Sequence, residues 1–318
     1  MISIIVPCYN EEAAIPLFYQ AMEAVKPACQ HQFEYIFVND GSSDQSLTQM
    51  RQLAKLDPQV RYISFSRNFG KEAGIYAGLQ AARGDLVTLM DVDLQDPPEL
   101  LPEMIACLKQ DPELDCVGTR RTTRTGEPPI RSLFAKAFYW GINKISDTHF
   151  VDGVRDYRLM TRQMVDAVLE MTEYNRFSKG IFAWVGFKTK YLSFENRDRV
   201  AGETSWSFWS LFSYSIEAII NFSDFPLTLA AIIGALMFLF SLLAGLFIII
   251  RTLIFADPVQ GWPSMMTVIL FIGGIQLLCL GIIGKYIGKI FLETKHRPIY
   301  IVKETEADIL VTSFKEED

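Results

Sequence analysis

The chain has 318 residues, a formal net charge of -7 and a hydrophobic content of 50%, with a mean hydropathy of +0.17. This composition is too apolar for an ordinary soluble protein and predicts a membrane portion. The five cysteines are an odd number without a C-x-x-C pair, which disfavours a disulfide framework and is typical of reduced core residues in a cytosol-facing protein. We expect no nucleic-acid partner.

Strand and helix patterns alternate from residue 1 to about residue 190. The apolar run Ile2–Val6 is typical of a parallel strand that is buried on both faces. Further strands are predicted at Tyr35–Val38, Val60–Phe65 and Leu86–Met90. Helices are predicted between them at Glu12–Val25, Ser43–Leu56 and Lys71–Ala82, the second capped by Ser42 or Ser43. Repeated βαβ units predict an α/β protein with a doubly wound, mostly parallel sheet.

Polar clusters follow each of the four predicted strands, at residues 7–12, 39–44, 66–71 and 91–96. Ligands of such sheets bind beyond the carboxyl ends of the strands, so the clusters are expected to converge on one rim. Tyr9, Asn10 and Asp40 could contact a base or ribose there, and Arg67 or Lys71 could pair with the negative charge of a phosphate. The sequence has neither G-x-G-x-x-G nor a P-loop motif, which argues against a dinucleotide cofactor and a P-loop NTPase.

The stretch TLMDVDLQDPPELL, residues 88–101, joins the fourth strand to an acidic turn. In an extended strand end, Asp91, Asp93 and Gln95 would point into one pocket while Val92 and Leu94 point into the core. Three oxygen-bearing side chains suit Mg²⁺ or Mn²⁺. An isolated D-x-D is more often a polar surface turn, but the convergence of four clusters favours a nucleotide diphosphate site with a metal.

Two charge-free segments of 24 and 21 residues, 227–250 and 264–284, are each long enough to cross a membrane, which takes about 20 residues. More basic residues follow the second segment than lie in the hairpin loop, which favours a cytoplasmic location for the catalytic domain and the C-terminal tail. Glycines in both segments could allow close packing, and we expect a homo-oligomer. The predicted organisation is a cytoplasmic catalytic domain, an interfacial helix, a two-helix transmembrane hairpin and a cytoplasmic tail at 1–200, 201–225, 226–286 and 287–318.

Seven motifs occur in order along the chain: PCYNEE, VNDGSSD, SRNFGKEAGIYAGL, DVDLQDPPEL, RDYRLM, FAWVGF and RVAGETSW. Together they resemble the family-2 glycosyltransferases of GT-A fold, specifically the polyisoprenyl-phosphate glycosyltransferases of the bactoprenol glucosyltransferase type, relatives of dolichol-phosphate mannose synthase. The resemblance implies inverting transfer of a sugar from a nucleotide sugar, UDP-glucose or UDP-N-acetylglucosamine, to undecaprenyl phosphate at the cytoplasmic face of the inner membrane, for modification of cell-envelope glycopolymers.

The resemblance also implies roles for individual residues. It places Asp40 on the nucleotide base, and Asp91, Asp93 and Gln95 around the metal and diphosphate. The expected catalytic residues are Asp93, Asp156 and Arg158. The nucleotide sugar is expected to contact Pro7, Tyr9, Asn10, Glu11, Asp40, Asn68, Lys71 and Asp91. Lipid phosphate or diphosphate is expected to contact Arg120, Arg121, Arg131, Arg155, Arg199 and Ser205.

Two of these positions depart from the family pattern. Arg155 stands where the family often has Gly, and Ser205 stands where it often has Lys. The first change could add a phosphate contact and the second removes one. The arginines near residue 120 also have a simpler interpretation, as part of a mobile surface loop.

A phosphate monoester carries a charge of roughly -1.5 to -2 at neutral pH, so a polyprenyl phosphate is already an anionic nucleophile. Asp156 is therefore expected to orient the acceptor or nearby arginines more than to remove a proton. A polysaccharide hydroxyl as acceptor, or a non-catalytic subunit of a lipid-sugar transport complex, are the alternatives. Processive synthases that use hydroxyl acceptors usually carry a Q-x-x-R-W motif, which this chain lacks.

Overall fold

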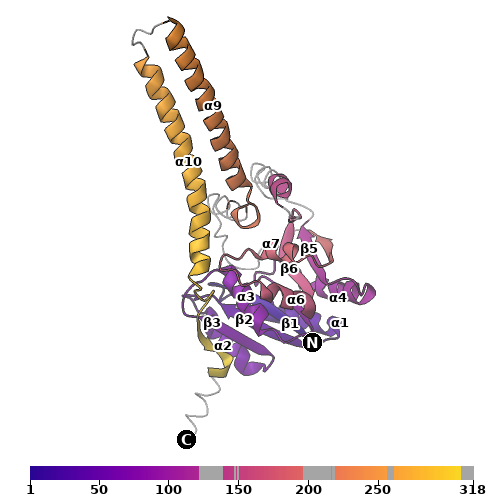
Figure 1. Cartoon of the computed structure of the whole chain (residues 1–318). Helices are drawn as coiled ribbons and strands as arrows, with labels where there is room; N and C mark the ends of the chain where they lie inside the picture. The colour runs from indigo at the N-terminus through magenta and orange to yellow at the C-terminus, as the bar shows by residue number, and fades with distance from the viewer. Residues whose placement is uncertain are drawn as a thin grey trace.

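The computed structural model describes residues 1–121, 139–146, 148, 150–195, 216, 219–255 and 261–308. In this described part an eight-stranded sheet has the order β7-β5-β6-β4-β1-β2-β3-β8, and two long helices project from it side by side (Figure 1). The strands are β1 Ile2–Cys8, β2 Phe33–Asn39, β3 Val60–Phe65, β4 Leu86–Leu89, β5 Cys116–Arg121, β6 Val154–Thr161, β7 Thr189–Phe194 and β8 Val302–Thr305. The helices are α1 Ala14–Cys29, α2 Ser46–Leu56, α3 Lys71–Ala81, the short 3₁₀ helix η1 Pro98–Leu100, α4 Leu101–Gln110, α6 Arg162–Glu170, α7 Ser178–Trp184, α9 Phe225–Phe255 and α10 Trp262–Thr294.

The strands β1 and β2 lie at the centre of the sheet, and every residue of both is buried. They pair in parallel with each other, and β4 and β3 flank them in the same direction. Two apolar clusters form the core: one lies under α1 and α4 and the other under α3, α6 and α7. The predicted α/β class is confirmed, with antiparallel pairing where β6 meets β4 and β5 and where β8 meets β3.

The start of α2 differs from the prediction. The helix begins at Ser46, and its first residues receive no cap from Ser42 or Ser43. The Ser42 hydroxyl instead accepts a hydrogen bond from the backbone N–H of Asn10, and the Ser43 N–H donates to the Asn10 side chain. The prediction of a serine cap was therefore wrong, because these two serines join neighbouring loops.

The two long helices carry the apolar segments. Phe225–Phe247 in α9 and Phe271–Thr294 in α10 have mean hydropathies of 2.5 and 1.6, and both are long and apolar enough to cross a membrane. At ~1.5 Å per residue, either segment exceeds the ~30 Å of a hydrocarbon core. Most of the interfacial helix predicted at 201–225 lies outside the described residues.

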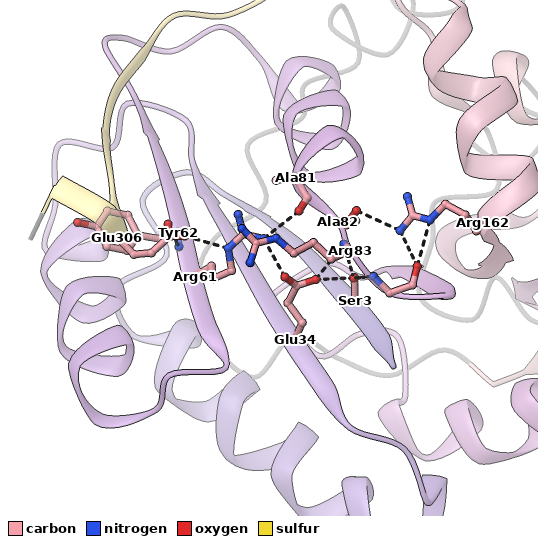
Figure 2. A network of polar contacts seen from close by, with 10 residues as sticks. Ser3, Glu34, Arg61, Tyr62, Ala81, Ala82, Arg83, Arg162 and Glu306 are labelled. Carbon is pink, nitrogen blue, oxygen red and sulfur yellow. Dashed lines mark hydrogen bonds and ion pairs between the residues drawn. The ribbon is translucent and has the colours of Figure 1, made fainter. Parts of the chain in front are cut away.

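The residues after α10 return to the sheet, where β8 pairs with β3. The segment predicted as the C-terminal tail, 287–318, therefore includes a strand of the sheet. Glu304 forms an ion pair with Arg51 and accepts a hydrogen bond from the Tyr62 hydroxyl. Figure 2 shows the neighbouring network, in which Arg61 lies between Glu306 and the buried Glu34 at N–O distances of 2.9 and 2.8 Å. The side chains of Glu304 and Glu306 thus hold β8 on the sheet edge.

Candidate active site

The loops that follow β1 and β2 interlock at the carboxyl end of the sheet. Asn10 has a left-handed backbone with φ of 55°, and its side-chain Oδ1 accepts from the Ser43 N–H at 2.8 Å. The Glu11 N–H donates to Ser46 Oγ at 2.8 Å. These contacts leave the Tyr9 ring 50% exposed at the rim. The structure therefore brings the first two predicted polar clusters together.

Asp40 connects the β2 loop to the loop that follows β3. Its two carboxylate oxygens accept hydrogen bonds from the backbone N–H groups of Phe69 at 2.6 Å and Gly70 at 2.9 Å. Burial raises the pKa of Asp40, and these hydrogen bonds oppose the increase. Gly41 beside it has φ of +66°, and a Cβ there would lie 2.3 Å from the carbonyl carbon of Arg67. Asp40 thus holds the loop after β3 close to Gly41, where any side chain would collide with the backbone of Arg67.

Two further residues of the predicted nucleotide-sugar site, Pro7 and Asn68, lie on this same rim or just beneath it. Pro7 is buried in β1, two residues before the exposed Tyr9, while Asn68 is exposed in the loop after β3. The guanidinium of Arg67, which was predicted to contact phosphate, stacks over the Phe69 ring at 4.0 Å and donates to the Asn68 carbonyl. Tyr9 in the loop after β1 and Asn68 in the loop after β3 are therefore exposed on this rim.

The acidic stretch after β4 is a turn, because β4 ends at Leu89 and Leu94 has a left-handed φ of 56°. The prediction of an extended strand end was wrong here. The Asp93 Oδ1 accepts a hydrogen bond from the N–H of Gln95 at 3.1 Å, which is the geometry by which Asp stabilises turns. Val92 still packs into the core as expected. The turn buries Asp93, whereas Asp91 faces the open rim.

Asp91 meets residues from two other elements at this rim. The Lys71 ammonium at the start of α3 lies 2.6 Å from Asp91 Oδ1 and 2.5 Å from Asp156 Oδ2 on β6. Lys179 on α7 lies 3.9 Å from the other oxygen of Asp156. Burial alone would raise the pKa of Asp156, but the charges of Lys71 and Lys179 outweigh it and hold that pKa well below its usual range. Asp156 is therefore an ionised carboxylate held between two lysines.

Glu72 fixes the two lysines relative to each other. Its carboxylate accepts hydrogen bonds from the backbone N–H of Ser178, at 2.8 Å, and from the Ser178 hydroxyl. Since Lys71 precedes Glu72 and Lys179 follows Ser178, this contact places one lysine on each side of Asp156. The sequence reasoning missed Glu72 and Lys179. Only the position of Glu72 inside the SRNFGKEAGIYAGL motif could have indicated it.

Arg155 and Arg158 leave β6 in different directions. The Arg155 Nε lies 2.9 Å from Asp96 Oδ1, and its Nη2 donates to Gln95 Oε1 at 3.4 Å. Arg158 is buried, donates to the backbone carbonyls of residues 155 and 156, and stacks over the Phe182 ring at 3.9 Å. Arg155 therefore braces the acidic turn, and Arg158 braces the strand that carries Asp156.

The remaining arginines predicted to contact phosphate are only partly described. Arg120 and Arg121 end β5, where Arg120 pairs with Val154 at the start of β6. Both therefore lie near the strand segment that carries Arg155 and Asp156. Three predicted residues fall outside the described part of the chain: Arg131, Arg199 and Ser205.

The donor set at the acidic turn fits a hard divalent cation in one specific way. Within the described residues, no three His, Cys, Asp or Glu side chains are grouped so that they could hold a metal ion. Mg²⁺, however, is often bound by one or two carboxylates, with substrate phosphates and water completing the coordination. Asp91 and Asp93 are carboxylates of that kind; Asp91 already pairs with Lys71, Asp93 is buried in the turn, and the Gln95 amide oxygen accepts from Arg155.

Comparison with known proteins identifies the family. The profile of glycosyl transferase family 2 matches residues 3–169. The chain is 42% identical over 302 residues to a bactoprenol glucosyl transferase of Shigella phage SfV, covering 95% of this chain and 98% of that one. It is 40% identical over 305 residues to a prophage bactoprenol glucosyl transferase homolog of Escherichia coli K12, covering 96% and 99%.

A putative glycosyltransferase of Bacillus subtilis is similar over the same extent, with 42% identity over 304 residues that cover 96% of this chain and 92% of that one. These matches agree with the order of the seven motifs and with the α/β sheet. The chain is therefore a glycosyltransferase of GT-A fold that belongs to family 2, in the group of the bactoprenol glucosyl transferases.

Proposed function

We propose that this glycosyltransferase moves glucose or N-acetylglucosamine from its UDP-sugar to undecaprenyl phosphate, with inversion, at the cytoplasmic face of the membrane. One observation carries the proposal: Lys71 joins Asp91 and Asp156 at the carboxyl ends of the strands, in a chain with two helices apolar enough to span a membrane. The names of the similar proteins, which refer to bactoprenol and glucose, support this acceptor and favour glucose as the sugar.

The phosphate of the acceptor needs little help from a base. Its second pKa is about 6, so it reaches the site already ionised at neutral pH. A general base works best when its pKa lies near the working pH, whereas the charges around Asp156 hold its pKa far below that. Asp156 is thus suited to position Lys71 and Lys179, whose charges draw in the anionic acceptor and the diphosphate.

Asp91 and Asp93 are the residues that would hold a divalent cation, with Gln95 beside them. When bound, Mg²⁺ or Mn²⁺ would neutralise charge on the departing nucleoside diphosphate. Arg155 contributes by holding Gln95 and Asp96, which keeps the turn in place. Tyr9 and the Asp40 loop are positioned to receive the base and ribose on the neighbouring part of the rim.

The proposed orientation rests on charge. Four basic residues lie within or just after the end of α10, namely Lys285, Lys289, Lys295 and Arg297, whereas Arg251 lies at the opposite end of the hairpin. This bias favours a cytoplasmic catalytic domain.

In the described chain, a Cβ added at Gly273, Gly274 or Gly281 would meet no atom within 4 Å. These open small-residue surfaces support a homo-oligomer in the membrane.

A transfer assay tests the proposal. The purified protein in detergent is incubated with undecaprenyl phosphate and a panel of nucleotide sugars, with and without EDTA, and lipid-linked sugar is separated and counted. We expect product from UDP-glucose or UDP-N-acetylglucosamine that EDTA abolishes and excess Mg²⁺ or Mn²⁺ restores. The absence of lipid-linked product with every donor would refute the acceptor assignment, and full activity in EDTA would refute the metal role.

A further inference from the structure

A polar pocket lies where α10 meets the sheet domain, and its lining includes Glu72 but neither Lys179 nor Asp156. It has a volume of about 220 Å³ and is lined by residues from the start of α3, the segment before α7, the segment before α9, and α10. Figure 1 shows the lower end of α10 reaching the domain beside α3 and β3. The lining contains neither Lys71 nor any of the three aspartates Asp91, Asp93 and Asp156. A ligand in this pocket would therefore lie beside the reacting cluster, next to Glu72, without occupying it.

Arg176 is the feature of the pocket that most needs a ligand. Its side chain is buried, with the residue only 8% exposed. Its Nη1 donates to the backbone carbonyl of Met171, and its guanidinium stacks over the Tyr76 ring at 4.3 Å. Its Nε has no hydrogen-bond partner in the described part of the chain. A buried donor without an acceptor is costly, so an acceptor that enters the pocket would be stabilised there.

The other polar groups around the pocket also favour an anion. The Lys289 ammonium donates to the Asn175 side chain at 3.0 Å and retains further N–H groups for a ligand, since an ammonium has three. The one acidic side chain of the lining described here, Glu72, already accepts two hydrogen bonds from Ser178 through one oxygen. Two further carboxylates lie beside the pocket: Glu173 interacts electrostatically with Arg176, and Glu293 accepts hydrogen bonds from the backbone N–H groups of Tyr174 and Asn175. Among the described residues, none of the three carboxylates bonds the Arg176 Nε, so this donor still needs an acceptor.

The height of the pocket along the helices indicates where the anion comes from. Lys289 lies five residues before the end of the second apolar segment, Phe271–Thr294, and Asn221 lies four residues before the first segment begins at Phe225. Both apolar helices thus enter the sheet domain at the level of the pocket. If they span a membrane, as the proposed function requires, this level is the headgroup layer.

We propose that this pocket binds the phosphate of a membrane phospholipid, with Arg176 and Lys289 as its charged partners. Guanidinium groups bind phosphate through paired, charge-assisted hydrogen bonds. The bound headgroup would fill the junction between α10 and the segment that precedes α7. This inference rests on membrane insertion but not on glycosyl transfer, so the two proposals can fail independently.

Binding is tested on the full chain in a phosphate-free maltoside detergent, without any nucleotide sugar. The probes are dihexanoyl-phosphatidylglycerol, dihexanoylglycerol without the phosphate, inorganic phosphate, and undecaprenyl phosphate, each titrated by calorimetry. We expect saturable binding of the phosphatidylglycerol and much weaker binding of the diacylglycerol and of inorganic phosphate. Equal affinity for either of these two would overturn the proposal, and so would undecaprenyl phosphate that displaces the phosphatidylglycerol at lower concentration.

Variants locate the binding. Arg176→Gln and Lys289→Gln are each expected to weaken phosphatidylglycerol binding about tenfold or more, as loss of a charged contact predicts. Lys295→Gln is the matched control, because it removes one positive charge just beyond α10, where the ammonium stacks over Phe291, and it should leave the affinity unchanged. If Arg176→Gln does not fold, Lys289→Gln on the helix surface gives the same test. Unchanged affinity in Lys289→Gln would overturn the assignment.

Discussion

Replacing Asp156 by Asn separates orientation from proton removal. The change removes one charge but keeps an oxygen for the hydrogen bond from Lys71, whose ammonium lies 2.5 Å from Asp156 Oδ2. A hydrogen bond to a charged group contributes ~1.5–3 kcal/mol, and the lower half applies here because 42% of the Lys71 side chain is exposed. Since each ~1.4 kcal/mol is tenfold in rate, Asp156→Asn should lower kcat about 10-fold.

Lys71→Met should be more harmful than Asp156→Asn. It leaves the carboxylates of Asp91 and Asp156 facing each other without the intervening ammonium, so we expect a loss of about 10³-fold, as for an uncompensated charge in a partly buried site. In the double variant one of the two facing charges is also removed. Its activity should therefore exceed that of Lys71→Met alone, which is a non-additive result typical of residues in contact.

The assay is transfer of labelled glucose to undecaprenyl phosphate, measured across pH 5.5–9 for each variant. In the orientation mechanism the pH profile keeps its acidic limb near pH 6, set by the ~6 second pKa of the lipid phosphate. Near-complete loss of activity in Asp156→Asn, together with a large shift of the profile, would mean that Asp156 removes a proton and that our reasoning is wrong. Strict additivity in the double variant would refute the proposed role of Lys71.

Three further outcomes follow from the contacts. Arg61→Met should lower the free energy of unfolding by about 3 kcal/mol at pH 7, because it strands the buried Glu34. Burial would raise the pKa of Glu34, but hydrogen bonds from Ser3 and Arg61 outweigh it, so this pKa is lowered in the folded protein. The extra stability of the wild type over Arg61→Met is therefore fully present above the pKa of Glu34 in the unfolded chain. It should shrink as the pH falls below that value. Gly41→Ala should raise KM for the nucleotide sugar and cost ~1–3 kcal/mol of stability. The backbone at residue 41 has a positive φ, and an added Cβ would collide with the backbone of Arg67. Glu293→Gln should speed hydrogen exchange at the backbone N–H groups of residues 174 and 175, because both groups donate hydrogen bonds to the Glu293 carboxylate.

Each of these predictions has a control and a contrary result. Arg83→Gln is the control for Arg61, because only the Arg83 backbone N–H reaches Glu34, and thermal unfolding should not distinguish it from the wild type. A Gly41→Ala variant with wild-type KM would show that the Asp40 loop tolerates a side chain. Unchanged exchange at residues 174 and 175 in Glu293→Gln would mean that α10 does not hold this segment. A wild-type advantage over Arg61→Met that grows at acidic pH would contradict the direction of the Glu34 shift.

The core of the fold was predictable because its signals are local. Most residues of β1 and β2 are apolar and all of them are buried, and the predicted bounds of the third strand, Val60–Phe65, match β3. The strand β8 was not predictable, because Val302–Thr305 is short and mostly polar and depends on distant partners such as Arg51. Its pairing is a tertiary contact across more than 200 residues, and no periodicity indicates it.

The candidate site was predictable to the level of the rim. The polar clusters do meet at the carboxyl ends of the strands, as the topology of parallel sheets requires. The partners of individual side chains were not predictable: Lys71 binds two aspartates, and Arg155 binds Asp96. Lys179 lies on α7, far along the chain from Lys71, the other partner of Asp156. Only the folded structure brings the Lys179 ammonium near the Asp156 carboxylate. The extended geometry predicted for Asp91 and Gln95 failed because an aspartate turn intervenes.

The return of the chain to the sheet limits how the catalytic part can be isolated. A fragment that ends before α9 would lack β8, and the backbone N–H and C=O groups along the outer edge of β3 would have no partner from this chain. Such edges tend to pair with other molecules. Recombinant expression that keeps β8, with the two apolar helices replaced by a short flexible linker from before α9 to just before Val302, should give a better-behaved soluble protein than simple removal of everything after residue 200.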